Sequence, residues 1–505
     1  MKHIKLYILL LFSSVIFGSC TKWLDGAIPK DQNIEGEQYS SEIGINSVLN
    51  GLYRELVSED LYGGQMTMTT IELLSHYYYH ADDISYNPNL IQFHQIGTYQ
   101  YNATEPLNRF KKIWEKYYNL LFRVNNFIYN VESSNVLSAE KKNIVLGEAH
   151  ALRAFLHLDL FRLFGSSTEG IPYNDSHEVV PHQKQPMEAY FTLLLKDIGT
   201  AKTLLANDPI ITGGIKIVEE NENIPESELF YEYYRNYRMN IYAVKALEAR
   251  TLAHQGKIAE AAIIASEIIA NSQGADLPFN WTNPTDVTNE FDYTFYSEII
   301  FGPQNLDIYD RWNKYVAGTR LGSVYLVEQN NLRSNILRFD VIPSSEISNW
   351  EDSRIRQWQG SKLTGYYISN KFADYNLKET DPKKYLQPLI RMAEMHYILA
   401  ENELAQNQTS NAVKIINEVR AKRGVQQASL PNPATVSKAD AYSMLEAEYY
   451  KEFYAEGQSF FYLKRQNAQS LFNANGSGYV NITDYVTPST GSIFVIPIPE
   501  SETNI

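Results

Sequence analysis

The sequence predicts an all-α protein, in which stacked helix pairs form a scaffold that carries a loop-rich insert with short strands. Three observations indicate this fold. Apolar residues recur at helical spacing through most of the 505 residues. Several of these helices follow one another in pairs joined by a short turn. One long segment, residues 274–384, lacks a helical period and is rich in Asn, Asp, Pro, Gly and aromatic residues.

The first helix pair is predicted over residues 107–165. In residues 107–131 the apolar side chains recur every three or four positions. Residues 148–164 read EAHALRAFLHLDLFRLF, with so few polar groups that this helix should be buried on most of its circumference. Ser138 is a preferred N-cap residue and Gly165 a preferred stop, so both ends of the second helix are marked.

Two further pairs are predicted over residues 186–272 and 385–424, followed by one helix over 439–465. The stretch IYAVKALEARTLAHQGKIAEAAIIASEIIAN, residues 241–271, carries alanines that let two helices approach closely, with Gly256 in the turn. It looks like a tetratricopeptide repeat, whose helix hairpins bury their apolar faces by stacking. Each stretch alone also fits an ordinary amphipathic helix. Several hairpins of similar spacing favour a helical-repeat scaffold.

Short strands are expected within the insert, in SEIIFG and TGYYISNKF. A segment of this length without helical period favours a functional insert over a linker. We therefore expect one domain, residues 20–505. Its parts are a helical-repeat scaffold (40–273 and 385–465), a ligand-binding insert (274–384) and an extended C-terminal tail (466–505).

The only cysteine, Cys20, follows a stretch that is typical of a signal peptide. Lys2 and Lys5 precede an apolar run, which is too short to span a bilayer comfortably, and small residues follow. An ordinary secretory signal needs no cysteine at this point. A lipoprotein signal does, because the thiol takes a diacylglyceryl group before cleavage. Residues 1–19 are thus predicted to be a lipoprotein signal peptide and Cys20 the lipid attachment site; the alternative is a plain signal peptide with an incidental cysteine.

Composition restricts the class of protein. With 44% hydrophobic and 20% charged residues, the chain should fold and not stay disordered. Its net charge of −15 argues against binding nucleic acid or anionic lipid by general electrostatics. There are 37 Tyr against 22 Phe, and tyrosine is the aromatic residue that tolerates a wet surface.

Catalytic motifs are missing from the sequence. There is no G-x-S-x-G, P-loop, H-E-x-x-H or G-x-G-x-x-G. His76 and His80 stand at i and i+4 and could present two ligands to zinc, but two unrelated histidines are the simpler interpretation. We predict no catalytic residue, metal or cofactor. The 59 acidic residues offer countless carboxylate pairs, so a glycoside hydrolase remains an alternative.

Two regions mix aromatic and polar side chains as ligand-binding sites do, namely the loop predicted over residues 76–106 and the insert. Trp312 is the first choice, because Tyr309 and Tyr315 flank it at three residues and could extend one stacking face. Core packing is the alternative for any single ring. The candidate ligand-binding residues are Asp83, Tyr86, Asn87, Tyr99, Trp281, Tyr309, Arg311, Trp312 and Tyr315.

A set of motifs runs nearly from end to end of the chain, and in this order and spacing the sequence resembles the SusD/RagB family. The motifs are SCTKWLDGAIP (19–29), VLNGLYREL (48–56), EAHALRAFLHLDLFRLFG (148–165), EIIFGPQN (298–305), DSRIR (352–356), PLIRMAEMHYILAENEL (388–404), INEVRAKRG (416–424), EFYAEGQSFFYLKR (452–465) and PIPESE (497–502).

The resemblance implies a SusD-like fold and a binding protein, not an enzyme. Such proteins are lipid-anchored at the outer membrane, facing outward, and sit as a lid on a SusC-like TonB-dependent transporter. They capture a nutrient, most often an oligosaccharide and, in RagB-like proteins, a peptide. The implied partners are therefore the ligand, the transporter and the membrane, without nucleic acid. A helical-repeat scaffold that binds proteins is a rival, but it would not explain the aromatic loops.

Overall fold

The structure is a computed structural model of the chain. It describes residues 35–78, 91–166, 170–219, 222–274, 277–316, 327–328, 352–360, 366–473, 478–485 and 490–500. Helices dominate these residues and the strands are few and short, which confirms the predicted all-α class. The predicted signal peptide and Cys20 lie outside the described residues.

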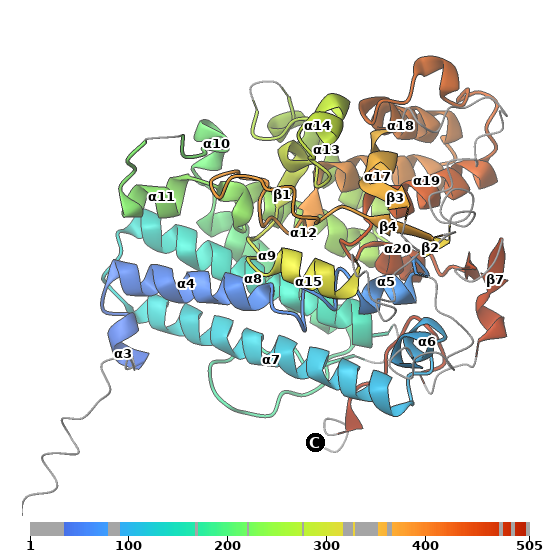
Figure 1. Cartoon of the computed structure of the whole chain (residues 1–505). Coiled ribbons are helices and arrows are strands. Elements are labelled where there is room, and N and C mark those ends of the chain that lie inside the picture. The colour runs from blue at the N-terminus through green and yellow to red at the C-terminus, as the bar shows by residue number, and fades with distance from the viewer. Residues whose placement is uncertain are drawn as a thin grey trace, which may run out of the picture.

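The scaffold is a series of long helices, each packed against the next. The first two long helices are α7 (Thr104–Ser133) and α8 (Ala139–Phe164), and Figure 1 shows α4 (Glu42–Leu56) lying along both of them. Successive helices stack as hairpins, so the predicted tetratricopeptide-like pairs are confirmed. In order of contact the helices are α7 (Thr104–Ser133), α8 (Ala139–Phe164), α9 (Met187–Leu204), α12 (Ile241–His254), α13 (Ile258–Ser272), α17 (Met392–Ala405), α18 (Thr409–Lys422) and α19 (Lys438–Glu452).

Local sequence signals set several helix ends. The Ser138 hydroxyl accepts a hydrogen bond from the backbone N–H of Lys141, as expected of the N-cap of α8. The side chain of Asn240 caps α12 by accepting from the N–H groups of Tyr242 and Ala243. Gly256, with φ of +77°, closes the turn between α12 and α13 in a conformation that favours glycine.

The predicted helix over residues 439–465 is broken in two, which corrects the sequence analysis. α19 ends at Glu452, and α20 (Ser459–Arg465) begins after a turn that contains Gly457 at φ +73°. A Cβ atom on Gly457 would lie 2.0 Å from the carbonyl oxygen of Met66, and its N–H donates to Glu72. The helix is thus broken between α19 and α20 where Gly457 approaches Met66 and Glu72, which come from a distant part of the chain.

The insert carries short strands and two short helices beside its loops. β1 (Ile299–Phe301) pairs antiparallel with β5 (Ile390–Arg391), and β2 (Val327–Glu328), β4 (Tyr366–Ser369) and β3 (Trp358–Gly360) form an antiparallel sheet in that order. The short strands were predicted. The two helices α14 (Pro284–Asn289) and α15 (Ile308–Tyr315) were not, so the predicted lack of helix in this segment is wrong.

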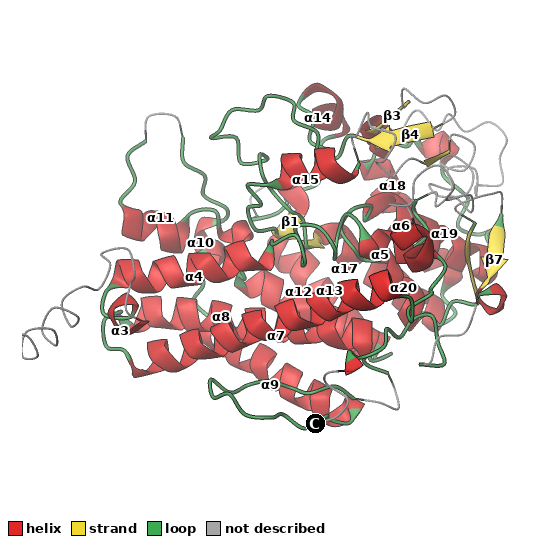
Figure 2. Cartoon of the chain, turned by 60° about the horizontal axis from the view of Figure 1, so that its bottom comes forward, coloured by secondary structure: helices red, strands yellow, loops and turns green. Residues whose placement is uncertain are grey.

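The other elements are short. β6 (Ser470–Phe472) pairs with β7 (Tyr479–Asn481) near the edge of the helical body, as Figure 2 shows for β7. Within the described ranges no helix has the length and apolar character to cross a membrane. The remaining helices and turns are α3 (Glu35–Gln38), α5 (Thr70–Leu74), α6 (Ile91–Gly97), α10 (Ile210–Gly213), α11 (Glu226–Glu232), η3 (Arg235–Tyr237), η4 (Tyr296–Glu298), η6 (Ser353–Gln357), η7 (Gln427–Ser429) and η8 (Ile482–Asp484).

A buried network of ion pairs joins the insert to the C-terminal helices. At its centre, the Glu452 carboxylate accepts hydrogen bonds from Arg354 at 3.0 Å, Arg391 at 2.6 Å and Arg423 at 2.6 Å. Burial alone would raise the pKa of Glu452, but the three guanidinium groups outweigh it and lower that pKa far below its usual range. The network extends through Glu298, Asp352, Lys371, Arg420, Glu448, Lys451 and Glu456.

Candidate ligand-binding surface

Helix α15 is amphipathic and presents opposite faces to the core and to solvent. Ile308, Trp312 and Val316 are buried, and their spacing of four residues places them on one face. Tyr309 and Tyr315 are half-buried on the two opposite edges of this buried face, where both rings also pack partly against the core. The helix therefore divides the candidate residues into a structural set and a set that can reach a ligand.

Trp312 belongs to the structural set. Its side chain is 0% exposed, and its ring packs edge-on against Phe372 at 5.4 Å and Tyr454 at 6.3 Å between ring centroids. The prediction that Trp312 is an exposed stacking residue is therefore wrong. The polar neighbours in the sequence suggested a loop, but they lie on the solvent side of a helix whose largest apolar residue points inward.

Tyr99 is a second correction, because its side chain is only 1% exposed. Its hydroxyl donates to the carbonyl oxygen of Leu74 at 2.9 Å, and its ring stacks on His76 with 5.6 Å between centroids. Tyr99 holds this part of the chain together and has no face left for a ligand.

Trp281 is half-buried in another part of the molecule. Its ring contacts His396 at 4.8 Å between centroids and lies 5.3 Å from the guanidinium carbon of Arg423. It packs against the core cluster formed mainly by α17, α18 and α19. The structure thus does not bring Trp281 together with the tyrosines of α15.

Beside α15, four partly exposed rings surround a small cavity, here called the aromatic hollow. Phe291 and Tyr375 stack face to face with 4.3 Å between centroids, and Tyr309 meets Tyr385 at 5.3 Å. Phe291 is 42% exposed. The cavity measures about 20 Å³, which suits a water molecule and not a sugar ring. A larger ligand would have to lie across the outer faces of these rings.

Polar groups stand on the other side of α15. The Glu59 carboxylate accepts hydrogen bonds from the Lys314 ammonium group at 2.6 Å and from the Tyr315 hydroxyl. Burial would raise the pKa of Glu59, but these two hydrogen bonds outweigh it and lower that pKa, so the carboxylate is ionised at neutral pH. Burial raises the pKa of Tyr309 to about 12, which leaves its hydroxyl able to donate.

Arg311 fastens α15 to the loop that follows α4. Its Nη1 donates to the carbonyl oxygen of Val57 and, at 3.0 Å, to Asn305 Oδ1, while Nη2 pairs with Asp307 at 2.6 Å. A Cβ atom on Gly63 would lie 1.9 Å from Nη1, so only glycine lets the guanidinium pass. Arg311 therefore positions the helix, with most of its donors already occupied.

Three predicted ligand residues, Asp83, Tyr86 and Asn87, lie outside the described residues. The chain leaves the described part after Tyr78, whose hydroxyl accepts a hydrogen bond from Tyr454 at 3.1 Å. Tyr454 in turn contacts Trp312. The role of Asp83, Tyr86 and Asn87 therefore stays a prediction.

Of the two histidines considered as zinc ligands, the structure describes only His76, and the surroundings of His76 do not support a metal site. His76 is buried, with Nδ1 2.6 Å from the carbonyl oxygen of Phe472 and Nε2 3.0 Å from that of Gly97. His80 lies outside the described residues. In the part of the chain that the structure describes, no three His, Cys, Asp or Glu side chains are grouped as a metal site would require.

Five residues at α15 and around it were missed by the sequence analysis: Glu59, Phe291, Lys314, Tyr375 and Tyr385. The stretches NEFDYTFY (289–296) and FADYNLK (372–378) mix aromatic and polar residues, so the criterion used for Trp281 would have found Phe291 and Tyr375 as well. Glu59 carries no local signal, because it comes from a turn about 250 positions earlier in the chain than Lys314 and Tyr315.

Comparison with known proteins relates both ends of the chain to one group of families. Residues 22–212 match the family model described as starch-binding and associating with the outer membrane. Residues 342–504 match the model of the SusD family. Together these two models match more than half of the chain. No match is found among the curated proteins.

Solved structures share the fold. A SusD superfamily protein from Bacteroides thetaiotaomicron VPI-5482 is 18% identical, with a TM-score of 0.65 over 92% of this chain and 98% of that one. A SusD-like carbohydrate binding protein from Bacteroides vulgatus ATCC 8482 is 15% identical, with a TM-score of 0.59 over 92% and 96%.

A laminarin binding SusD-like protein is 17% identical, with a TM-score of 0.58 over 92% of this chain and 97% of that one. At such identities these likenesses show the fold alone, and the family models carry the relationship. With its helical scaffold and these two matches, the chain belongs to the SusD family, a family of carbohydrate-binding proteins.

Proposed function

We propose that this protein is a non-catalytic, cell-surface lipoprotein that captures an oligosaccharide beside α15 and delivers it to a SusC-like TonB-dependent transporter. The observation that carries the proposal is that partly exposed rings and charged hydrogen-bonding groups flank the same short helix, the rings along one edge and the charged groups along the other. We call this set the α15 surface; it comprises Glu59, Phe291, Tyr309, Lys314, Tyr315, Tyr375 and Tyr385.

The chemistry of the α15 surface suits a sugar. Ring faces can stack on the C–H faces of a pyranose, while carboxylate, ammonium and hydroxyl groups bind the sugar hydroxyls. The matched family is described as starch-binding, and one similar structure as laminarin binding. These descriptions belong to those proteins, and they support a carbohydrate as the ligand of this one.

The state of Glu59 favours binding over hydrolysis. A glycosidase needs a carboxylic acid whose pKa is raised, so that it can protonate the leaving group near neutral pH. Lys314 and Tyr315 instead lower the pKa of Glu59 against the effect of burial. An ionised carboxylate in this position is a hydrogen-bond acceptor and not an acid catalyst.

The proposed place of action is the outer membrane, with which the matched family is described as associating. Residues 1–19 would be removed as a signal peptide and Cys20 acylated. Burying acyl chains contributes about 0.8 kcal/mol per CH₂, so more than one chain on Cys20 would anchor the protein stably. In this proposal the transporter, and not the binding protein, would use energy for uptake.

The ligand can be tested with the soluble chain from residue 21 onward, on a glycan array and then by calorimetric titration. Tyr309→Ala and Tyr375→Ala should each weaken the binding of the selected glycan by about thirtyfold, as expected for the loss of about 2 kcal/mol from an aromatic anchor. Tyr129→Ala is the matched control, because this tyrosine is 49% exposed on α7, outside the α15 surface, and its loss should leave affinity unchanged.

Three outcomes would contradict the proposal. Unchanged affinity in both α15 variants would place the ligand elsewhere. Release of shorter sugars during incubation would make the protein a glycoside hydrolase. Binding to a peptide library but to no glycan would favour the peptide-uptake alternative. For the partner, purification from native outer membranes should yield a TonB-dependent barrel, and its repeated absence would refute that part.

A further inference from the structure

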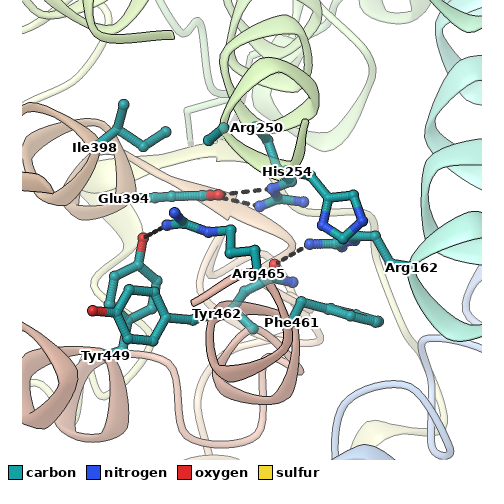
Figure 3. Close-up of a pocket in the computed structure, with 11 residues that line it drawn as sticks. Arg162, Arg250, His254, Glu394, Ile398, Tyr449, Phe461, Tyr462 and Arg465 are labelled. Carbon is teal, nitrogen blue, oxygen red and sulfur yellow. Dashed lines mark hydrogen bonds and ion pairs between the residues drawn. The ribbon is translucent and has the colours of Figure 1, made fainter. Parts of the chain in front are cut away.

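A small internal cavity lies where helices α8, α12, α17, α19 and α20 meet, within the scaffold. It measures about 20 Å³. Figure 3 shows the side chains of Arg162 and Arg250 beside the imidazole of His254, while a third arginine that lines the cavity, Arg465, points its guanidinium group to Tyr449. Such a concentration of guanidinium groups in a protein interior requires compensation, because burying a charge is costly unless it is paired.

Two buried polar atoms at this cavity lack a partner. Arg250 is only 4% exposed, and it uses Nε and Nη2 to bind Glu394 at 2.8 and 2.6 Å, whereas its Nη1 has no partner among the described residues. His254 Nδ1 is also buried without a hydrogen bond in this part of the chain. Because a guanidinium N–H only donates, the missing partner of Arg250 is an acceptor.

The charges around the cavity do not balance. Each arginine has one carboxylate: Arg162 pairs with Asp159, Arg250 with Glu394, and Arg465 with Glu401. Lys464 adds a further cation, whose ammonium group donates to the carbonyl oxygens of Arg162 at 2.6 Å and Gly165 at 3.0 Å. Among the described residues no carboxylate lies within ion-pair distance of Lys464. One positive charge is therefore left over.

The titration behaviour of the neighbouring groups agrees with this excess. Burial, together with Lys464, Arg162 and Arg465, lowers the pKa of His254 well below its usual value, so the imidazole is neutral and can offer an N–H without adding charge. Burial and Arg162 lower the pKa of Lys464 to about 7. A negative charge nearby would favour the ammonium form of Lys464.

We propose that this cavity binds one small monovalent inorganic anion, such as chloride, through Arg250 Nη1 and the N–H of His254. The anion supplies the acceptor that Arg250 lacks and offsets the charge of Lys464, which a water molecule cannot do. The volume suits a single atomic ion and excludes a polyatomic anion such as sulfate. Both donors come from α12, and the site is independent of any sugar ligand.

The test uses the soluble chain from residue 21 onward, transferred into sodium gluconate and titrated with chloride or bromide at constant ionic strength. A bound ion stabilises the folded state by mass action, and for a chain of this size the thermal midpoint should rise by about 3 to 5 °C once the halide is about 100 times its Kd. Crystals grown in bromide should show an anomalous peak between Arg250 Nη1 and His254 Nδ1. Equal midpoints in gluconate and halide, or a cavity without a bromide peak, would overturn the proposal.

Matched variants separate the site from general stability. Lys464→Met removes the excess cation and should weaken halide affinity by about tenfold or more. Lys451→Met is the control, since this buried lysine is paired with Glu448 in the other ion network, and it should keep the full halide response. His254→Phe retains an aromatic ring but lacks the N–H, and it takes the place of Lys464→Met if that variant does not fold. An unchanged halide response in Lys464→Met would contradict the inference. If Lys464→Met does not fold, an unchanged response in His254→Phe would contradict it.

Discussion

Two single variants, Trp312→Ala and Tyr309→Ala, should distinguish the structural role of the buried face of α15 from the ligand-binding role of its partly exposed edge. Trp312 is fully buried, and a buried tryptophan removes roughly 150–250 Å² from water. At about 25 cal/mol per Å² this corresponds to about 4 to 6 kcal/mol, close to the 3 to 5 kcal/mol typical of Trp→Ala in a core. We therefore expect Trp312→Ala to lower the free energy of unfolding by about 4 kcal/mol.

Thermal unfolding and glycan titration, applied to both variants, form the assay. For a chain of this size about 1 kcal/mol shifts the midpoint by roughly 1 to 2 °C, so Trp312→Ala should lower it by roughly 4 to 8 °C. Tyr309→Ala should lower it far less, because this side chain is only half-buried, and yet lose about thirtyfold in glycan affinity. The reverse pattern, a stable Trp312→Ala protein without affinity, would refute the assignment of the two faces.

Three further predictions concern stability and anchoring. Glu452→Gln should lower the free energy of unfolding, measured by chemical denaturation, by about 3 to 5 kcal/mol, because it leaves three buried guanidinium groups short of a carboxylate. As the control, Glu418→Gln on the exposed side of α18 should change it by less than about 0.5 kcal/mol. Burial raises the pKa of Asp292 to about 6, above its value near 4 in an unfolded chain, so the free energy of unfolding should fall as pH rises from about 4 to 7. Asp292→Asn cannot ionise, so in this variant the fall should be smaller by about 2 to 3 kcal/mol. An unaltered profile of stability against pH would contradict this prediction. Cys20→Ala should give a folded protein that no longer fractionates with the outer membrane, and full retention after detergent-free washing would refute the lipid anchor.

The scaffold could be predicted because its determinants are local. Each long helix carries its own apolar period, and residues such as Ser138 and Gly256 mark its ends. The break after Glu452 could not be predicted in this way. It depends on the approach of Gly457 to Met66, almost 400 residues earlier in the chain, and no local pattern records such a contact.

The candidate site was predicted only in part, for the same reason. Tyr309 and Tyr315 are partly exposed and their role as ligand residues stays a prediction, whereas the error at Trp312 could have been avoided from the spacing of Ile308, Trp312 and Val316. Glu59 and the ring pairs of the aromatic hollow come from separate parts of the chain. Their meeting beside α15 is a result of the tertiary fold.

The motifs that carry the family resemblance supply the buried ion network, and this explains why they predict the fold and not the ligand. EIIFGPQN contributes Glu298, DSRIR contributes Asp352 and Arg354, INEVRAKRG contributes Arg420 and Arg423, and the motif at 452–465 contributes Glu452 and Glu456. A buried charge that loses its partner destabilises the protein whatever the ligand is.

The α15 sequence, IYDRWNKY, lies outside these motifs. Ile308 and Trp312 are fully buried, whereas Tyr309 and Tyr315 are only partly buried against the core. Tyr309, Lys314 and Tyr315 contact residues outside the ion network, so substitutions at these positions leave that network intact. Under the proposed function, fold and ligand choice are therefore carried by different residues. The proposal places the determinants of the glycan's identity on the exposed edges of α15 and on the rings beside it, and not in the motifs that carry the family resemblance.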